Sequence, residues 1–122
     1  MKVKTSEAER QVLNYLVAQC QGVEIVCVKN GQATFIDHTD GGALNEMPIN
    51  YSNDWTLGGP IIEREKIGIV PDDGDANIWI GSVYEPEWRF NRTGPTPLIA
   101  AMRCYVSSKL GDEVEIPAEL CV

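Results

Sequence analysis

One segment, Tyr51–Glu63, carries the residues of this sequence that are best suited to binding a ligand. Its two aromatic side chains can stack on a base or another ring. Its polar residues stand where a helix is expected to begin, and a helix start presents free backbone N–H groups that attract anions. Two adjacent glycines would let a ligand approach the backbone closely. The candidate ligand-binding residues in this segment are Tyr51, Ser52, Asp54, Trp55, Gly58 and Gly59.

A structural interpretation of the same segment competes with the ligand-binding one. Ser52 can act as the N-cap of the helix, and Asp54 in the first turn suits the positive end of the helix dipole. Asp54 would then fill the position that a phosphate needs. Trp55 would pack in the core. Both interpretations remain open at the level of the sequence.

Trp88 and Arg89 form a second candidate surface, in a polar loop expected over residues 85–94. An exposed aromatic ring beside an arginine suits contact with a partner or a ligand. The alternative is that this loop folds its aromatic rings over the edge of a sheet.

Catalytic and metal-binding patterns are weak in this sequence. His38 is the only histidine and has no cysteine or histidine at ligand spacing, which disfavours a zinc site. The run Asp72–Asp75 is typical of a solvated turn, because an EF-hand spreads its ligands over a longer loop. The sequence contains no nucleophile elbow, phosphate-binding loop or dinucleotide fingerprint. We therefore predict no catalytic residue, no metal site and no cofactor.

Composition and charge narrow the class of protein. The chain has 122 residues, with Lys+Arg 10 against Asp+Glu 18 and a formal net charge of -8. Nucleic-acid binding is disfavoured, because such proteins concentrate positive charge to contact phosphates. The chain shows no secretory signal and no apolar run long enough for a membrane. The four cysteines are far apart and form no Cys-x-x-Cys pair, and three of them, Cys20, Cys27 and Cys104, have apolar neighbours. This usage indicates a reducing compartment, so we expect the cytoplasm of a cell.

Local patterns predict three helices and two hairpins. The first helix is expected to start at a capping box of Ser6 and Glu9 and to stop at Gly22. The second is expected to begin at Ser52 and to end near Lys66. The remaining elements are a hairpin over 23–36, strands over 67–70 and 78–83, and a helix that Thr96 caps and Gly111 ends. Residues 38–50 are expected to form a loop.

These elements predict an α+β fold in the order α-β-β-α-β-β-α. We expect a layered sandwich in which three helices cover a mostly antiparallel four-stranded sheet. We expect residues 1–122 to form a single domain. Residues 112–122 are an acidic C-terminal tail, either loose or lying along the edge of the sheet.

Two separated blocks resemble a known phage family. The first is Tyr51-Ser52-Asn53-Asp54-Trp55 with Gly59-Pro60-Ile61-Ile62-Glu63, and the second is the run from Gly94 to Arg103. In this order they resemble the NinX-like proteins of tailed phages, and they are similar to the wider phage ABA sandwich domain. The resemblance implies a layered helix–sheet–helix fold and a phage origin. The family has no assigned biochemical activity, so it supplies no catalytic residues.

These observations favour a non-enzymatic phage accessory protein that acts by binding. It could sequester a small nucleotide-like host defence signal. The alternative is an acidic protein–protein module that inhibits or modulates a host or recombination enzyme. A hydrolase that uses His38 and nearby carboxylates is a third hypothesis. Pairing through a hairpin edge or a helix face would also allow a homo-oligomer.

Overall fold

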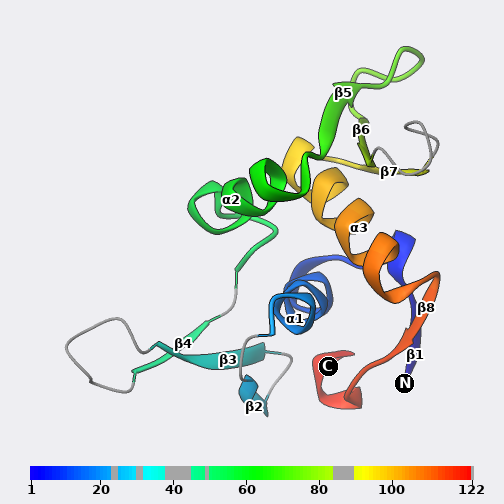
Figure 1. Cartoon of the computed structure of the whole chain (residues 1–122). Coiled ribbons are helices and arrows are strands. Elements are labelled where there is room, and N and C mark those ends of the chain that lie inside the picture. The colour runs from blue at the N-terminus through cyan, green and yellow to red at the C-terminus, as the bar shows by residue number, and fades with distance from the viewer. Residues whose placement is uncertain (23–24, 30–31, 38–44, 49, 84–89, 122) are drawn as a thin grey trace.

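The computed structural model describes residues 1–22, 25–29, 32–37, 45–48, 50–83 and 90–121, which form a mixed α+β fold (Figure 1). The helices are α1 Arg10–Cys20, α2 Trp55–Glu65 and α3 Pro97–Leu110, with short 3-10 helices η1 Thr5–Glu7 and η2 Ala118–Cys121. The strands are β1 Lys2–Lys4, β2 Ile25–Lys29, β3 Gln32–Asp37, β4 Asn45–Pro48, β5 Gly68–Pro71, β6 Trp79–Val83, β7 Phe90–Gly94 and β8 Glu113–Glu115.

The predicted single four-stranded sheet is wrong. In the described part of the chain the strands form three antiparallel sheets, β1-β8, β2-β3-β4 and β5-β6-β7. Both predicted hairpins are present, as β2-β3 and β5-β6. β4 follows the first hairpin in the chain and pairs with β3, and β7 follows the second hairpin and pairs with β6. The two hairpins therefore belong to separate sheets and do not pair with each other.

Two segments predicted as loops contain strands. The loop expected over 85–94 ends in β7, and the loop expected over 38–50 contains β4. Both strands are polar in sequence and lack the alternation of apolar residues that signals a half-buried strand. They form because each lies beside an existing hairpin with unpaired backbone groups at its edge.

Helix α3 lies at the centre of the fold, between the β5-β6-β7 sheet and helices α1 and α2 (Figure 1). Most of its length is buried, from Leu98 to Ser107, which fits a helix that is apolar on nearly all sides. Its ends follow the predicted signals. The Thr96 side chain accepts a hydrogen bond from the Ile99 backbone N–H at 3.1 Å, and Gly111 follows the last turn with a positive φ of 88°.

Small residues let the β5-β6-β7 sheet approach α3 closely. A Cβ atom added to Gly81 would lie 2.6 Å from the carbonyl oxygen of Ala100. A Cβ atom added to Gly94 would lie 2.7 Å from the backbone nitrogen of the same residue. The two glycines sit on neighbouring strands, β6 and β7, so the helix backbone rests directly on the sheet backbone at this point.

The start of α1 differs from the prediction, whereas its end agrees. Ser6 lies within η1, and Glu9 is the N-cap residue of α1 without a side-chain capping bond, so the predicted capping box is wrong. Arg10, the first residue of α1, has a positive φ of 53°, a conformation that costs energy for a residue with a side chain. Gly22 follows the helix in the predicted left-handed conformation, with φ 70°.

The C-terminal segment is an edge segment and not a loose tail. β8 pairs with β1, so that Glu115 lies opposite Lys2 and Glu113 lies opposite Lys4. The residues that follow turn back onto the core, where Ile116 is buried. The acidic composition of this segment therefore matches the basic composition of its partner strand.

No helix in the described residues is both long enough and apolar enough to cross a membrane.

Candidate functional site

The start of α2 is capped by Asp54 and not by Ser52, which corrects the predicted N-cap. The Asp54 side chain accepts a hydrogen bond from the backbone N–H of Thr56 at 2.9 Å. Its carbonyl oxygen accepts from the N–H of Gly58, also at 2.9 Å. A carboxylate thus occupies the positive end of the helix, where a phosphate would otherwise bind.

Ser52 instead anchors the segment to α1. Its backbone N–H and its hydroxyl group both donate to Oδ1 of Asn14, at 2.8 and 2.7 Å. Both residues are about 1% exposed, so these bonds are shielded from water. The Nδ2 group of Asn14 is buried and has no hydrogen-bond partner among the residues that the structure describes. Burying the Nδ2 group without a partner is unfavourable. The two hydrogen bonds from Ser52 must therefore supply the free energy that holds the Asn14 side chain in this position.

The two adjacent glycines of α2 lie in different surroundings. A Cβ atom added to Gly58 would lie 2.5 Å from Cδ1 of Leu98 and 2.8 Å from the carbonyl oxygen of Tyr51. Gly58 therefore lets α2 pack against α3. A Cβ atom added to Gly59 would meet no atom of the described part of the chain within 4 Å. Of the two, only Gly59 faces open space where a ligand could approach.

This difference makes a matched pair of substitutions informative. Gly58→Ala should lower the free energy of unfolding by about 1–3 kcal/mol, because the methyl group overlaps a side chain and a backbone carbonyl. Gly59→Ala should raise it by up to about 1 kcal/mol, because alanine restricts the unfolded chain and favours the helix. Urea denaturation of both variants would measure the two values. Equal values would contradict the packing described for Gly58.

Trp55 is the first residue of α2 and is 53% exposed. It does not pack in the core, so that part of the structural interpretation is wrong. Tyr51, three positions before the N-cap residue Asp54, is half-buried and packs against the hydrophobic core. Burial raises the pKa of its hydroxyl group, which stays protonated at neutral pH.

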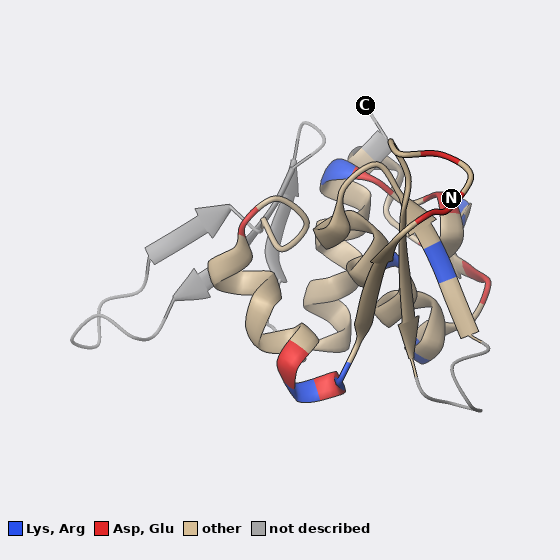
Figure 2. Ribbon diagram, turned by 90° about the horizontal axis from the view of Figure 1, so that it is seen from above, with Lys and Arg blue, Asp and Glu red and all other residues tan. Residues whose placement is uncertain are grey.

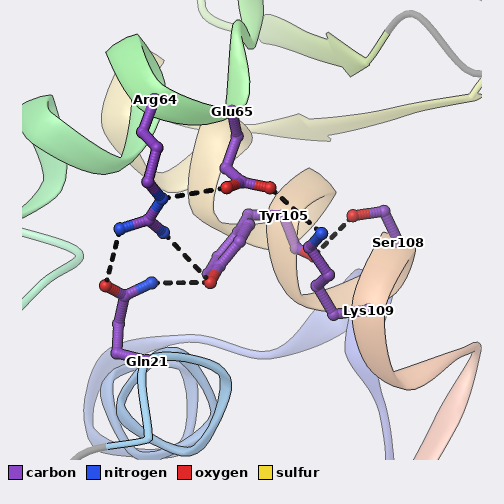
Figure 3. Close-up of polar contacts among 6 residues, drawn as sticks. All are labelled: Gln21, Arg64, Glu65, Tyr105, Ser108 and Lys109. Carbon is purple, nitrogen blue, oxygen red and sulfur yellow. Dashed lines mark hydrogen bonds and ion pairs between the residues drawn. The ribbon is translucent and has the colours of Figure 1, made fainter.

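A cluster of polar side chains joins all three helices at the other end of α2 (Figure 3). Nε2 of Gln21 donates to the hydroxyl oxygen of Tyr105 at 2.6 Å, and Arg64 donates to the same oxygen at 3.4 Å and to Oε1 of Gln21 at 3.1 Å. Glu65 accepts from Arg64 at 2.9 Å and forms an ion pair with Lys109 at 3.1 Å. Glu65 thus bridges two cations that belong to different helices.

The chemistry of this cluster favours a structural role. The hydrogen bond from Arg64, together with Lys109, holds the pKa of Glu65 below its usual value, so this carboxylate is ionised and paired at neutral pH. Burial raises the pKa of the Tyr105 hydroxyl group. Neither group is poised to exchange a proton near pH 7. The cluster therefore fastens α2 to α1 and α3. The alternating charges that end α2 are visible in Figure 2.

Comparison with known proteins decides the family. The family model described as bacteriophage P22, NinX matches residues 4–109. The chain belongs to the phage P22 NinX family. The match covers η1, helices α1 and α2, all of α3 except its last residue, and the sheet β5-β6-β7, and it therefore includes both blocks on which the resemblance rests. No curated protein matches the chain.

The remaining predicted residues of this NinX-family protein lie in different places. The structure brings Tyr51, Ser52, Asp54 and Trp55 together in one turn, but Ser52 points into the fold while Trp55 points out. Trp88 and Arg89 lie outside the described residues, as does His38. The similarity to the ABA sandwich domain stays a prediction.

The polar cluster around Tyr105 and the buried Asn14 have no clear signal in the sequence. Arg64 and Glu65 look like an ordinary charged helix end, and Gln21 like the polar residue before a terminating glycine. Only the spacing of Tyr105 and Lys109, one helical turn apart, could have suggested a shared face. Within the described residues no three histidine, cysteine or acidic side chains gather into a group that could hold a metal ion.

The two cysteines whose surroundings are described are poor nucleophiles in the NinX-family fold. Burial raises the pKa of the Cys20 and Cys104 thiols to about 11, and Cys104 is completely buried. The unfolded chain would ionise its thiols near pH 9.0, so the stability that these protonated thiols contribute should be lost as pH rises from 9 to 11.

The thiolate is the reactive form, and Cys104 should therefore resist alkylation at pH 8 until the protein unfolds. Site-resolved mass spectrometry after iodoacetamide treatment would test this expectation, and rapid labelling of Cys104 in the native state would contradict it.

Proposed function

We propose that this phage protein acts by binding a partner protein, without catalysis, through the exposed start of α2. The observation that carries the proposal is the exposure of Trp55, whose side chain is 53% accessible at the first position of a capped helix. Exposed tryptophans on rigid elements are frequent centres of protein interfaces, because a large ring is buried there with little loss of freedom. The bonds of Asp54 and Ser52 supply the rigidity.

The partner that best suits this protein is a basic host or recombination enzyme. The net charge of -8 favours association with a positively charged surface and would make the rate of association fall as salt is added. We propose the host cytoplasm as the place of this interaction.

A nucleotide-type host defence signal is the second candidate partner. It is supported by Gly59, which lies one helical turn from Trp55 and leaves open space beside it, so that a base could stack on the ring. The capping carboxylate of Asp54 weighs against it, because that group already takes the N–H of Thr56 that a phosphate would use. For this reason we place the partner protein first.

The experiment that tests the first candidate compares three versions of the protein as bait in lysate of the host. Trp55→Ala should abolish capture of the partner, whereas Val70→Ala, at a site that is 52% exposed on another element, should leave it unchanged. Capture by wild type should weaken as salt rises. Equal capture by Trp55→Ala and wild type would overturn the proposal.

A thermal-shift screen tests the second candidate. A nucleotide or cyclic nucleotide that binds the folded protein must raise its melting temperature when present in excess. The shift should disappear in Trp55→Ala. If no such compound stabilises wild type at saturating concentration, the nucleotide candidate is excluded.

A further inference from the structure

The strand β1 has a free edge, which lies opposite the edge that pairs with β8. Met1 and Ile116 exchange two backbone hydrogen bonds of 2.8 Å, and the N–H of Thr5 donates to the carbonyl oxygen of Asp112 at 2.9 Å. Hydrogen-bonding residues alternate along an antiparallel pair. Since the odd-numbered residues of this strand face β8, the backbone N–H groups of Lys2 and Lys4 face the other way. Neither N–H has a partner within the described residues.

A groove of about 360 Å³ runs along this free edge. One side is β1, and the other is formed by η1 and the start of α1. The residues that line the groove are Lys2, Val3, Lys4, Glu7, Ala8, Glu9 and Val12. Lys2 and Lys4, whose N–H groups lie on the free edge, both line this groove, and Val3, Ala8 and Val12 are its apolar residues. An unpaired strand edge of this kind is the surface to which an extended peptide can add.

The native partner of β1 indicates what such a peptide should contain. β8 presents an acidic, an apolar and an acidic residue, Glu113-Val114-Glu115, opposite Lys4, Val3 and Lys2. The same three side chains of β1 would face a strand added at the free edge. Glu7 and Glu9 on the far side of the groove lie close enough to Arg103 for their charges to interact with its guanidinium, which offsets their repulsion of an acidic peptide.

We propose that the free edge of β1 binds an extended segment of a partner protein that carries an acidic–apolar–acidic pattern. The segment adds as a third strand beside β1. Its acidic side chains face Lys2 and Lys4, and its apolar side chain enters the groove over Val3 and Val12. A second copy of this chain suits the edge poorly, because two β1 strands would set lysines against lysines. This surface is separate from Trp55, so the proposal stands or falls independently of the proposed function.

Fluorescence anisotropy with a labelled peptide that copies residues 111–116 tests this proposal. The copied peptide should bind wild type, and a peptide with lysines in place of both glutamates should bind at least about tenfold more weakly. Binding should also be lost when an N-methyl group blocks a backbone N–H on the edge of the peptide that faces β1. These comparisons use unmodified protein, so they do not depend on the folding of a variant. Equal binding of the acidic and basic peptides would overturn the proposal.

Two variants at one position separate the backbone group from the charge. Lys4→Pro removes the free N–H and the charge, whereas Lys4→Ala removes the charge alone. Lys4 has φ -85° and ψ 126°, which proline tolerates, and its N–H is not used by β8. Lys4→Pro should bind the peptide about tenfold more weakly than Lys4→Ala does. Equal affinities in two folded variants would contradict strand addition. If sedimentation shows a wild-type dimer that Lys4→Pro abolishes, the edge takes a second copy and the peptide proposal is wrong.

Discussion

Gly81→Ala should lower the free energy of unfolding by about 3 kcal/mol, at the upper end of the usual cost of overpacking. The added methyl group would lie 2.6 to 2.9 Å from backbone atoms of Ala100 and Ala101. Backbone atoms at the centre of a buried helix cannot rotate away, so β6 and α3 would have to separate. Chemical denaturation followed by circular dichroism would measure the loss.

Gly74→Ala is the matched control for this substitution. Gly74 lies in the turn of the same hairpin, and the nearest atom to an added Cβ is Oδ1 of Asp72 at an ordinary 3.5 Å. Its substitution should change the free energy of unfolding by no more than about 0.5 kcal/mol. If Gly81→Ala were as mild as this control, the close contact between sheet and helix would be wrong.

Asn14→Ala should cost about 2–3 kcal/mol, because it removes the acceptor of two buried donors. The backbone N–H and the hydroxyl group of Ser52 would both lose their partner in a site that water does not reach. The substitution also removes the buried Nδ2 group, which has no partner in the described part of the chain, and this offsets part of the loss of stability. Amide hydrogen exchange at Ser52 should accelerate together with the loss of stability.

Asn53→Ala is the control, since the side chain of Asn53 is exposed and its hydrogen bond to Asn50 is long, at 3.3 Å. It should change the free energy of unfolding by no more than about 0.5 kcal/mol. Asn14→Ala should also reduce binding at Trp55 more than its effect on stability explains, because Ser52 holds the segment that carries the ring. Unchanged exchange at Ser52 in Asn14→Ala would contradict the anchoring described here.

Elements with strong local signals could be predicted from the sequence. Helix α3 has Thr96 as its cap, proline in its first turn and Gly111 after its last turn, and each signal acts within a few residues. The hairpins follow from short runs of β-branched residues. In contrast, β7 is polar, and it became a strand only because β6 lies beside it. The division into three sheets depends on such pairing between strands, which local patterns do not specify.

The candidate site was predictable only as a segment. Ser52 and Asp54 are both good capping residues, and the choice between them depends on Asn14, which is 38 positions away. The roles of Gly58 and Gly59 depend on the approach of Leu98 from α3. The same limit explains why the cluster around Tyr105 was missed, since its members come from three helices. The role of a residue that is held by a distant element cannot be predicted from the sequence of its own segment.

One measurement tests most directly whether this phage protein acts by binding through the start of α2. A photo-crosslinking amino acid is placed at position 55 in the full-length protein, and at position 70 as an equally exposed control. Both versions are irradiated in infected cells, and the products are identified by mass spectrometry. Binding through α2 predicts one dominant protein crosslinked at position 55 and absent at position 70. The same crosslinks at both positions, or none at position 55, would contradict it.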